Sequence, residues 1–263
     1  MTEDAATAPS AGPSAGGVQS VQRAFDLLEI VVAGGGVMAI GQIATASGMP
    51  LPTIHRLLRT LVERGYMRQL PNRRYALGFR LVPLGIAANA MIGEAAHPML
   101  QTLVDQLGET ANLAILSGDH AEYVAQVPSR HAMRMFTEVG RRVELHCTGV
   151  GKAMLAQLPE AQVAGIVRRV GMPAHTDLTI TTEPELHASL ATIRELGYAL
   201  DEQEQESGVR CVAVPIASGP GSWLAVSVSG PLTRMGDEVV ERAVPLLRSA
   251  AQRLADTMTG TGT

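Results

Sequence analysis

Two cysteines and a neighbouring histidine are the first candidates for chemistry in this sequence. Cys147 and Cys211 are the only cysteines of the 263-residue chain, and His146 directly precedes the first of them. A Cys-His hydrolase needs its thiol and imidazole within hydrogen-bond reach of each other. Adjacent side chains on an extended segment point to opposite faces, and the remaining histidines follow no motif. We therefore predict no catalytic residue and do not expect an enzyme.

Metal and phosphate sites can be judged in the same region. His146, Cys147, Asp201 and Cys211 are ligand types that zinc accepts, but they lack the paired Cys-x-x-Cys or His-Glu-x-x-His spacing of a zinc motif. Residues 149–153, GVGKA, resemble the end of a phosphate-binding loop without its first glycine and its final Ser or Thr. The sequence therefore predicts neither a metal ion nor a cofactor.

The net charge of −4 hides an uneven distribution of basic and acidic residues. Residues 18–80 carry eight arginines against three acids, and residues 81–263 carry 13 basic and 20 acidic residues. The first segment therefore has a net charge of +5 and the second a net charge of −7, and two further acidic residues precede residue 18. A basic module on an acidic body is typical of a protein that meets phosphates at one end. Charge alone does not separate this interpretation from a solvated basic face.

The elements of residues 18–78 predict a winged helix-turn-helix. Ser20 can cap a first helix that ends at the glycines of 34–36, and a second helix is expected over about 40–47. A third helix starts near Leu51, since Pro52 suits a first turn. Residues 66–70 and 74–77 then predict a hairpin. Three helices with a short turn before the third, followed by a hairpin, define this module.

The third helix of such a module is the one that reads DNA bases. Its apolar positions 54, 57, 58 and 61 share one face and leave a basic face opposite. On that face Arg56 could donate two hydrogen bonds to one guanine, and Arg59, one helical turn further on, is better placed to contact a phosphate. The hairpin tip would bring further arginines to a minor groove or to the DNA backbone. The predicted DNA-contacting residues are Arg23, Pro52, Thr53, His55, Arg56, Arg59, Arg73 and Arg74.

A linker helix, residues 79–94 with a kink at Pro83, is predicted to join this module to a second domain at 95–258. That domain should begin with a helix at 95–107 and then mix strands with helices, several strands following one another in hairpin order. Such a pattern predicts an α+β domain around an antiparallel sheet. The expected strands are 111–116, 121–127, 133–139, 211–216 and 223–229, and the expected helices are 148–158, 159–170, 183–196 and 239–255.

The first residues and the overall hydropathy limit the cellular context. Residues 1–17 hold no large apolar residue after Met1, so we expect a disordered tail there. This segment also lacks the basic residues of a secretory signal. No apolar run reaches the ~20 residues that a membrane span needs. We expect a cytoplasmic protein without a membrane partner.

The sequence resembles the IclR family of transcriptional regulators over residues 18–256. The matching stretches of the first domain are SVQRA from residue 20, LPTIHRLL from 51 and YALG from 75. Those of the second are LHCTGVGKA from 145, GYALDEQE from 197, GVRCVAVPI from 208 and AVSVSGP from 225. The resemblance implies a homodimer, or a dimer of dimers, on double-stranded operator DNA. It also implies a GAF- or profilin-like domain that binds a small organic effector, and it is strongest for regulators of allantoin and glyoxylate catabolism.

The resemblance further implies where the effector binds. Relatives that bind glyoxylate or pyruvate hold the carboxylate on backbone N–H groups at a helix start, where unpaired donors and the positive dipole end coincide. Ser227 and Ser229, two apart on a predicted strand, share one face. The residues alone leave open a core role for Cys211 and a solvated one for Asp201 and the serines. The implied effector-binding residues are Gly149, Val150, Asp201, Cys211, Ser227 and Ser229.

These observations predict a ligand-responsive DNA-binding transcriptional regulator, a repressor of a small-molecule catabolic operon. Its effector would be a small organic acid such as glyoxylate or a metabolite of the allantoin pathway. Two alternatives stay open: a small-molecule sensor that acts through protein partners, and a Cys-dependent hydrolase. Loss of DNA affinity on neutralising Arg56 would separate the regulator from the sensor.

Overall fold

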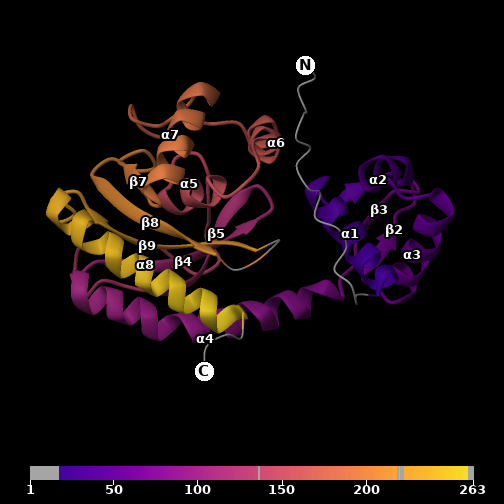
Figure 1. Ribbon diagram of the computed structural model, residues 1–263, viewed down its shortest axis with the longest axis horizontal. Helices are drawn as coiled ribbons and strands as arrows, with labels where there is room; N and C mark the ends of the chain where they lie inside the picture. Colours follow the sequence, from indigo (N-terminus) through magenta and orange to yellow (C-terminus); the bar gives the residue numbers. More distant parts are fainter. Residues whose placement is uncertain (1–17, 136, 218, 220–221, 260–263) are drawn as a thin grey trace, which may run out of the picture. The chain divides into compact units, whose positions relative to one another are not determined.

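The protein folds into two compact units, Met1–Gly85 and Ile86–Thr263. The structure, a computed structural model, describes residues 18–135, 137–217, 219 and 222–259 (Figure 1). The disordered tail predicted at 1–17 lies outside the described residues. Within them, no helix is both long enough and apolar enough to cross a membrane.

The first unit is a winged helix-turn-helix, as predicted. Its elements are α1 (Gln19–Ala33), β1 (Val37–Met38), α2 (Ile40–Ser47), α3 (Leu51–Glu63), β2 (Met67–Gln69) and β3 (Tyr75–Leu77). The helices bury Leu27, Ile43 and Leu58 in one core, and the strands pair in the order β1-β3-β2. Gly48 ends α2 at φ +63, a left-handed conformation that allows the sharp turn into α3. Ser20, predicted as the cap of α1, lies in its first turn instead, and Val18 occupies the cap position.

One continuous helix, α4 (Leu81–Leu107), stands where the sequence predicted a kinked linker helix at 79–94 and a separate helix at 95–107. The predicted division was wrong. Pro83 falls in the first turn, where no intrahelical bond is lost, so it need not kink the helix. Gly93, in the interior, weakens a helix by only about 1 kcal/mol, which packing can offset.

The second unit is an α+β domain around a six-stranded antiparallel sheet, which confirms the predicted fold class. The strand order is β6-β5-β4-β9-β8-β7. Besides most of α4, its elements are β4 (Thr110–Ser117), β5 (His120–Val127), β6 (Arg142–Val143), α5 (Gly149–Leu155), α6 (Glu160–Val170), α7 (Glu183–Leu196), β7 (Ala199–Glu202), β8 (Val209–Ala217), β9 (Trp223–Pro231) and α8 (Asp237–Thr259).

Two details of the sheet differ from the prediction. The described residues of 133–139, a segment predicted to be a strand, form no strand. Thr137 of this segment instead donates to Asn112 Oδ1 at 3.0 Å, so the segment covers the polar end of β4. The edge strands β6 and β7 were not predicted, because each is too short to show a period.

The sheet separates two layers of core (Figure 1). On one face α4 and α8 bury residues such as Leu100 and Leu247 against Val226 and Val228 of β9. On the other face α5, α6 and α7 pack against the small residues Ala114, Ala199, Ala213 and Ala225 of the sheet. Because side chains alternate along a strand, Ser227 and Ser229 lie on the face that α5 covers. Polar residues of the sheet are thus placed beside the start of α5.

Candidate functional site

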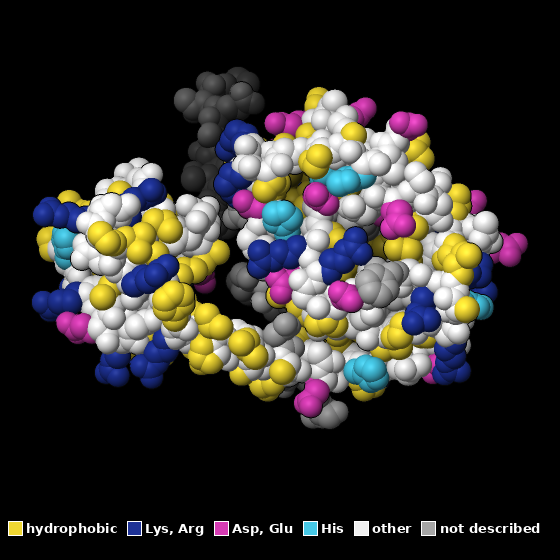
Figure 2. Space-filling model, turned by 180° about the vertical axis from the view of Figure 1, so that it is seen from behind, with side chains coloured by type: hydrophobic (Ala, Val, Ile, Leu, Met, Phe, Trp, Pro, Cys, Tyr) yellow, Lys and Arg dark blue, Asp and Glu magenta, His cyan; other side chains and the backbone are white. Residues whose placement is uncertain are grey.

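The exposed face of α3 presents the basic residues predicted to contact DNA. Ile54, Leu57, Leu58 and Leu61 are buried against the unit's core, so the opposite face points outward. Figure 2 shows one face of this unit, where Lys and Arg side chains outnumber acidic ones. A hollow of about 520 Å³ lies between α3 and the wing; it is lined by Pro52, His55, Arg56, Arg59, Val62, Glu63, Gln69 and Tyr75.

The remaining arginines of the predicted interface have different surroundings. Arg73 sits at the tip of the hairpin with φ +61 and is exposed. Arg74 donates from Nη2 to the Val37 carbonyl oxygen at 2.9 Å, so its guanidinium ties the wing to β1. Arg23, on α1, lines a second hollow of about 470 Å³ beside the turn from α2 to α3. Thr53 is half-buried in the first turn of α3.

Three of the predicted effector-binding residues form one row across the sheet of the second unit. Asp201 on β7 pairs with Cys211 on β8, and Cys211 pairs with Ser229 on β9. Residues opposite each other in this way share a face, with Cβ atoms about 5 Å apart. Ser227 lies on the same face one row further on, opposite Ala213. Asn112 Nδ2 donates to Ser229 Oγ at 3.3 Å and continues the polar row toward β4.

A small cavity of about 40 Å³ opens above this row. Of the six predicted residues, Gly149, Asp201, Cys211 and Ser229 line it, whereas Val150 and Ser227 are buried without lining it. Sequence reasoning missed several lining residues: most lie in loops or on strands without a motif, and Thr148 lies within the LHCTGVGKA stretch but was not singled out. They include Tyr123, Met135, Thr137, Arg141, Val143, Thr148, Gln205 and Glu206.

Burial controls the charge state of this cavity. Asp201 is 4% exposed and accepts hydrogen bonds from the backbone N–H groups of Glu204 (2.7 Å) and Gln205 (3.4 Å). Burial outweighs these bonds and raises the pKa of Asp201 to about 7. Burial likewise raises the pKa of the Cys211 thiol to about 12. Cys211 is therefore a neutral thiol rather than an activated nucleophile.

The glycines of the GVGKA segment are required by packing. A Cβ on Gly151 would lie 2.5 Å from Leu145 Cα, and one on Gly149 would lie 3.0 Å from Cys211 Sγ. Thr148 caps α5, since its hydroxyl accepts from Gly151 N at 3.2 Å and donates to the Glu144 carbonyl oxygen at 2.6 Å. Close contact between α5 and the sheet, rather than a phosphate, accounts for the small residues.

Lys152, the only lysine of the sequence, lies in the interior of the second unit. Its Nζ pairs with Glu204 Oε1, and both side chains are less than a tenth exposed. A buried pair of this kind costs desolvation on both partners, and removing one partner would leave an uncompensated charge. The pair joins α5 to the loop that follows β7. Backbone N–H groups of this loop donate the hydrogen bonds that Asp201 accepts.

A helix-turn-helix with an exposed basic reading helix, in one chain with an α+β domain that contains a small polar cavity, defines a DNA-binding transcriptional regulator. Residues 85–256 match the family described as "Bacterial transcriptional regulator IclR C-terminal", and residues 20–71 match "IclR helix-turn-helix domain". The chain therefore belongs to the IclR family.

Individual relatives agree over nearly the whole chain. The "Transcriptional repressor IclR" of Escherichia coli strain K12 is 34% identical over 253 residues, 94% of this chain and 92% of that protein. The "Acetate operon repressor" of Salmonella typhimurium strain LT2 is 34% identical over 260 residues, 97% and 95% of the two chains. The crystal structure of the Thermotoga maritima IclR matches with a TM-score of 0.62 at 28% identity, over 91% and 98%. These relatives are transcriptional regulators and not enzymes.

Proposed function

We propose that this protein is a repressor of a small-molecule catabolic operon and that a small organic acid controls its binding to operator DNA. The cavity above Asp201, Cys211 and Ser229 is the observation that carries the effector part of the proposal. A relative whose name states that it represses the acetate operon supports a carboxylate as the class of effector. Because a repressor acts on the chromosome, we place the protein in the cytoplasm.

The size of the cavity favours a very small effector. A water molecule needs roughly 10–15 Å³ of such volume, so about 40 Å³ admits a ligand of only a few heavy atoms. Glyoxylate has this size, and a metabolite as large as allantoin would require the cavity to open. The Ser229 hydroxyl and the backbone N–H groups at the start of α5 supply donors for a carboxylate. Asp201 can lie beside that carboxylate in its neutral form.

In this proposal α3 enters the major groove, with Arg56 on a guanine, Arg59 on a phosphate and Arg73 of the wing on the adjacent backbone or minor groove. We further propose a homodimer, or a dimer of dimers, on half-sites one helical turn (~10 bp) or a multiple apart. The exposed apolar residues Val21, Phe25 and Leu84 support a second copy as partner. They border a hollow of about 710 Å³ within the first unit.

The first test is a DNA-binding titration on the region upstream of the protein's own gene. Salt must be fixed, because phosphate contacts make affinity steeply salt-dependent. The titration is repeated with glyoxylate, pyruvate, allantoin and allantoate. We expect specific binding that one small acid changes. Specific binding that no acid alters would contradict the effector assignment, and binding to no operator would favour the sensor that acts through protein partners.

A variant in the cavity separates an effector role from a structural one. Ser229→Ala combined with Asp201→Ala should abolish the response to the acid while leaving DNA affinity without effector unchanged, since neither residue belongs to the first unit. The same titration measures both quantities. If DNA affinity without effector fell instead, the two residues would serve the fold of the second unit and not ligand recognition.

A further inference from the structure

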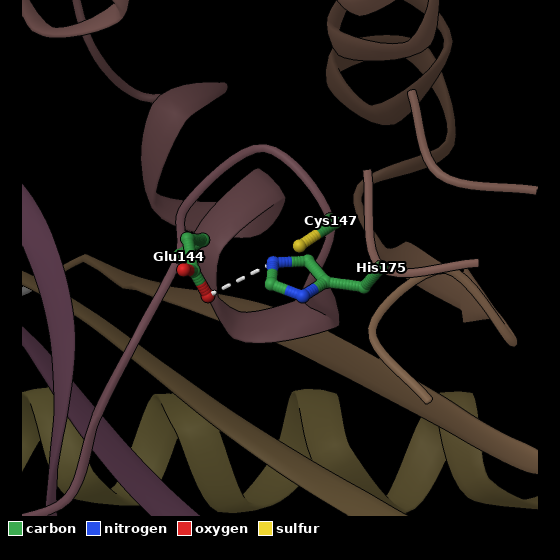
Figure 3. Close-up of side chains that lie close together, drawn as sticks. All are labelled: Glu144, Cys147 and His175. Atoms are coloured by element: carbon green, nitrogen blue, oxygen red, sulfur yellow. Dashed lines mark ion pairs between the residues drawn. The ribbon is translucent and has the colours of Figure 1, made fainter. Parts of the chain in front are cut away.

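A second polar cluster lies next to the effector cavity, on the loop that leads into α5. Glu144 and Cys147 come from this loop, and His175 comes from the loop between α6 and α7 (Figure 3). A carboxylate oxygen, the sulfur and a ring nitrogen all lie within 4.8 Å of one another. We propose that Glu144, Cys147 and His175 bind a zinc ion, with the fourth position open to water or a small anion.

The donor set matches the coordination chemistry of zinc. Zn²⁺ accepts thiolate, imidazole and carboxylate together, at about 2.3, 2.0 and 2.1 Å, and keeps a fourth position open where the protein supplies three ligands. Two ligands at these distances in a tetrahedron lie about 3.3–3.6 Å apart. His175 Nε2 and Glu144 Oε2 are already 3.5 Å apart. The two separations to the sulfur are at most 4.8 Å, so they need to close by at most about 1.3 Å to reach the tetrahedral distances.

Hydrogen bonds hold the backbone of both loops in place, so the positions of Glu144, Cys147 and His175 relative to one another are fixed by the fold. Thr148 Oγ1 donates to the Glu144 carbonyl oxygen at 2.6 Å. The backbone N–H of His175 donates to Thr179 Oγ1 at 3.0 Å, and that hydroxyl donates to the Glu204 carbonyl oxygen at 2.6 Å. Anchoring of this kind orients metal ligands in known sites.

Further bonds fix the same loop at both ends. Thr176 Oγ1 donates to the Gln203 carbonyl oxygen at 2.8 Å, after the end of β7. His146 Nε2 donates to the Pro173 carbonyl oxygen at 3.1 Å. His146 therefore supports the backbone near His175 rather than offering its Nε2 to the metal.

The local charge also favours a cation. Glu144 belongs to the cluster and is half-buried, so its carboxylate brings negative charge to the site. The ammonium of Lys152 is paired with Glu204 and therefore does not offset it. A cation at the centre of the cluster would compensate the charge of Glu144.

The zinc ligands considered from sequence are not the ones that converge. Only Cys147 belongs to both sets. Cys211 packs against Gly149 in the effector cavity, and Asp201 accepts from two backbone N–H groups. His175 was not considered, because it follows Cys147 by 28 residues in a loop without a zinc motif.

The test uses the untagged full-length chain after removal of metal with a chelator. Zn²⁺ is titrated against a chromogenic chelator, and Co²⁺ is added separately as a spectroscopic probe. We expect one ion per chain, with visible bands typical of tetrahedral Co²⁺ and a thiolate-to-cobalt charge-transfer band. Loss of supporting residues around a metal ligand costs 10–100-fold in affinity, so Cys147→Ser and His175→Gln should each weaken binding by about 100-fold or more.

Matched controls make the result specific. Cys211→Ser changes the other cysteine, and His97→Gln changes an exposed histidine of α4; both should keep the affinity and the Co²⁺ spectrum. Glu144→Gln retains the shape of the side chain and should also weaken zinc binding. It tests the same site if Cys147→Ser fails to fold. Absence of stoichiometric binding, or a charge-transfer band that survives in Cys147→Ser, would overturn the proposal.

Discussion

At the scale of single residues, Asp201 is a group whose protonation state near neutral pH depends on its surroundings. It is buried on the polar row of the sheet, and its pKa of about 7 lies well above that of a solvated aspartate. Between about pH 4 and pH 7 the folded protein therefore binds a proton at Asp201 that the unfolded chain has lost. Stability contributed by this group falls as pH rises through that window. The same proton decides whether the cavity tolerates a second negative charge.

The affinity for a carboxylate effector should consequently fall as pH rises. The effector keeps its charge across pH 6–8.5, whereas Asp201 becomes ionised and repels it above its pKa. The fall should approach tenfold per pH unit, the limit for one proton. Asp201→Asn imitates the neutral acid and should give a flat profile. Calorimetric titrations of each protein with the acid that changes operator binding measure both profiles. Equal slopes for the wild type and Asp201→Asn would contradict a role of Asp201 in this pH dependence.

Arginine residues of the first unit should differ in what they contribute to DNA binding. Arg56→Ala removes the proposed bidentate hydrogen bond to a guanine. It should weaken specific DNA binding by about 1–3 kcal/mol and relax the base preference at one operator position. Arg59→Ala removes a phosphate contact and should weaken binding to all sequences and lower the salt slope by about one. Arg130→Ala, an exposed arginine of the second unit, is the control. Footprints and salt titrations distinguish these outcomes; an unchanged footprint for Arg56→Ala would refute the assignment.

At the scale of elements, the start of α5 is tightly constrained by its packing against neighbouring backbone. Gly151→Ala places a methyl group 2.5 Å from the Leu145 backbone, which cannot move as a side chain would. We expect a loss of about 1–3 kcal/mol in the free energy of unfolding, typical of overpacking. Gly85→Ala, in an open stretch of α4, is the matched control and should raise helix stability by up to about 1 kcal/mol. Denaturant unfolding compares the two, and equal effects would contradict the packing argument.

Local patterns predicted the elements that repeat over several turns or strand residues, and missed those that tertiary contacts define. The apolar stripe of α3 and the alternation of Val226, Ser227, Val228 and Ser229 were sufficient to assign a face to each residue. The segment at 133–139 was also predicted as a strand, although its apolar and polar residues do not alternate strictly; Thr137 bonds to Asn112, and the segment forms no strand among its described residues. The cavity residues Thr137 and Gln205 and the proposed zinc ligand His175 lie in loops, where no period indicates what they contact.

At the scale of the whole molecule, the proposed function requires that a ligand bound in the second unit change DNA binding by the first. The boundary between the two units along the chain falls within α4, which begins at Leu81 in the first and runs to Leu107 in the second. A ligand changes DNA affinity only by binding differently to two states of the protein, and the effect is reciprocal. Such coupling typically amounts to 1–3 kcal/mol, a 5–150-fold change in affinity. A continuous helix can carry it only while its hydrogen bonds persist.

Weakening α4 just after the boundary between the units should therefore uncouple the two sites. Ala87→Gly with Ala88→Gly, both exposed, costs about 2 kcal/mol of helix propensity without removing a buried contact. We expect DNA affinity without effector, and effector affinity without DNA, to stay near the wild-type values. The change in DNA affinity caused by the effector should shrink toward none, and the reciprocal effect with it. Ala188→Gly with Ala191→Gly imposes the same cost on exposed positions of α7 and should leave the coupling intact. Full coupling in the α4 variant would mean that the signal reaches the first unit by another route.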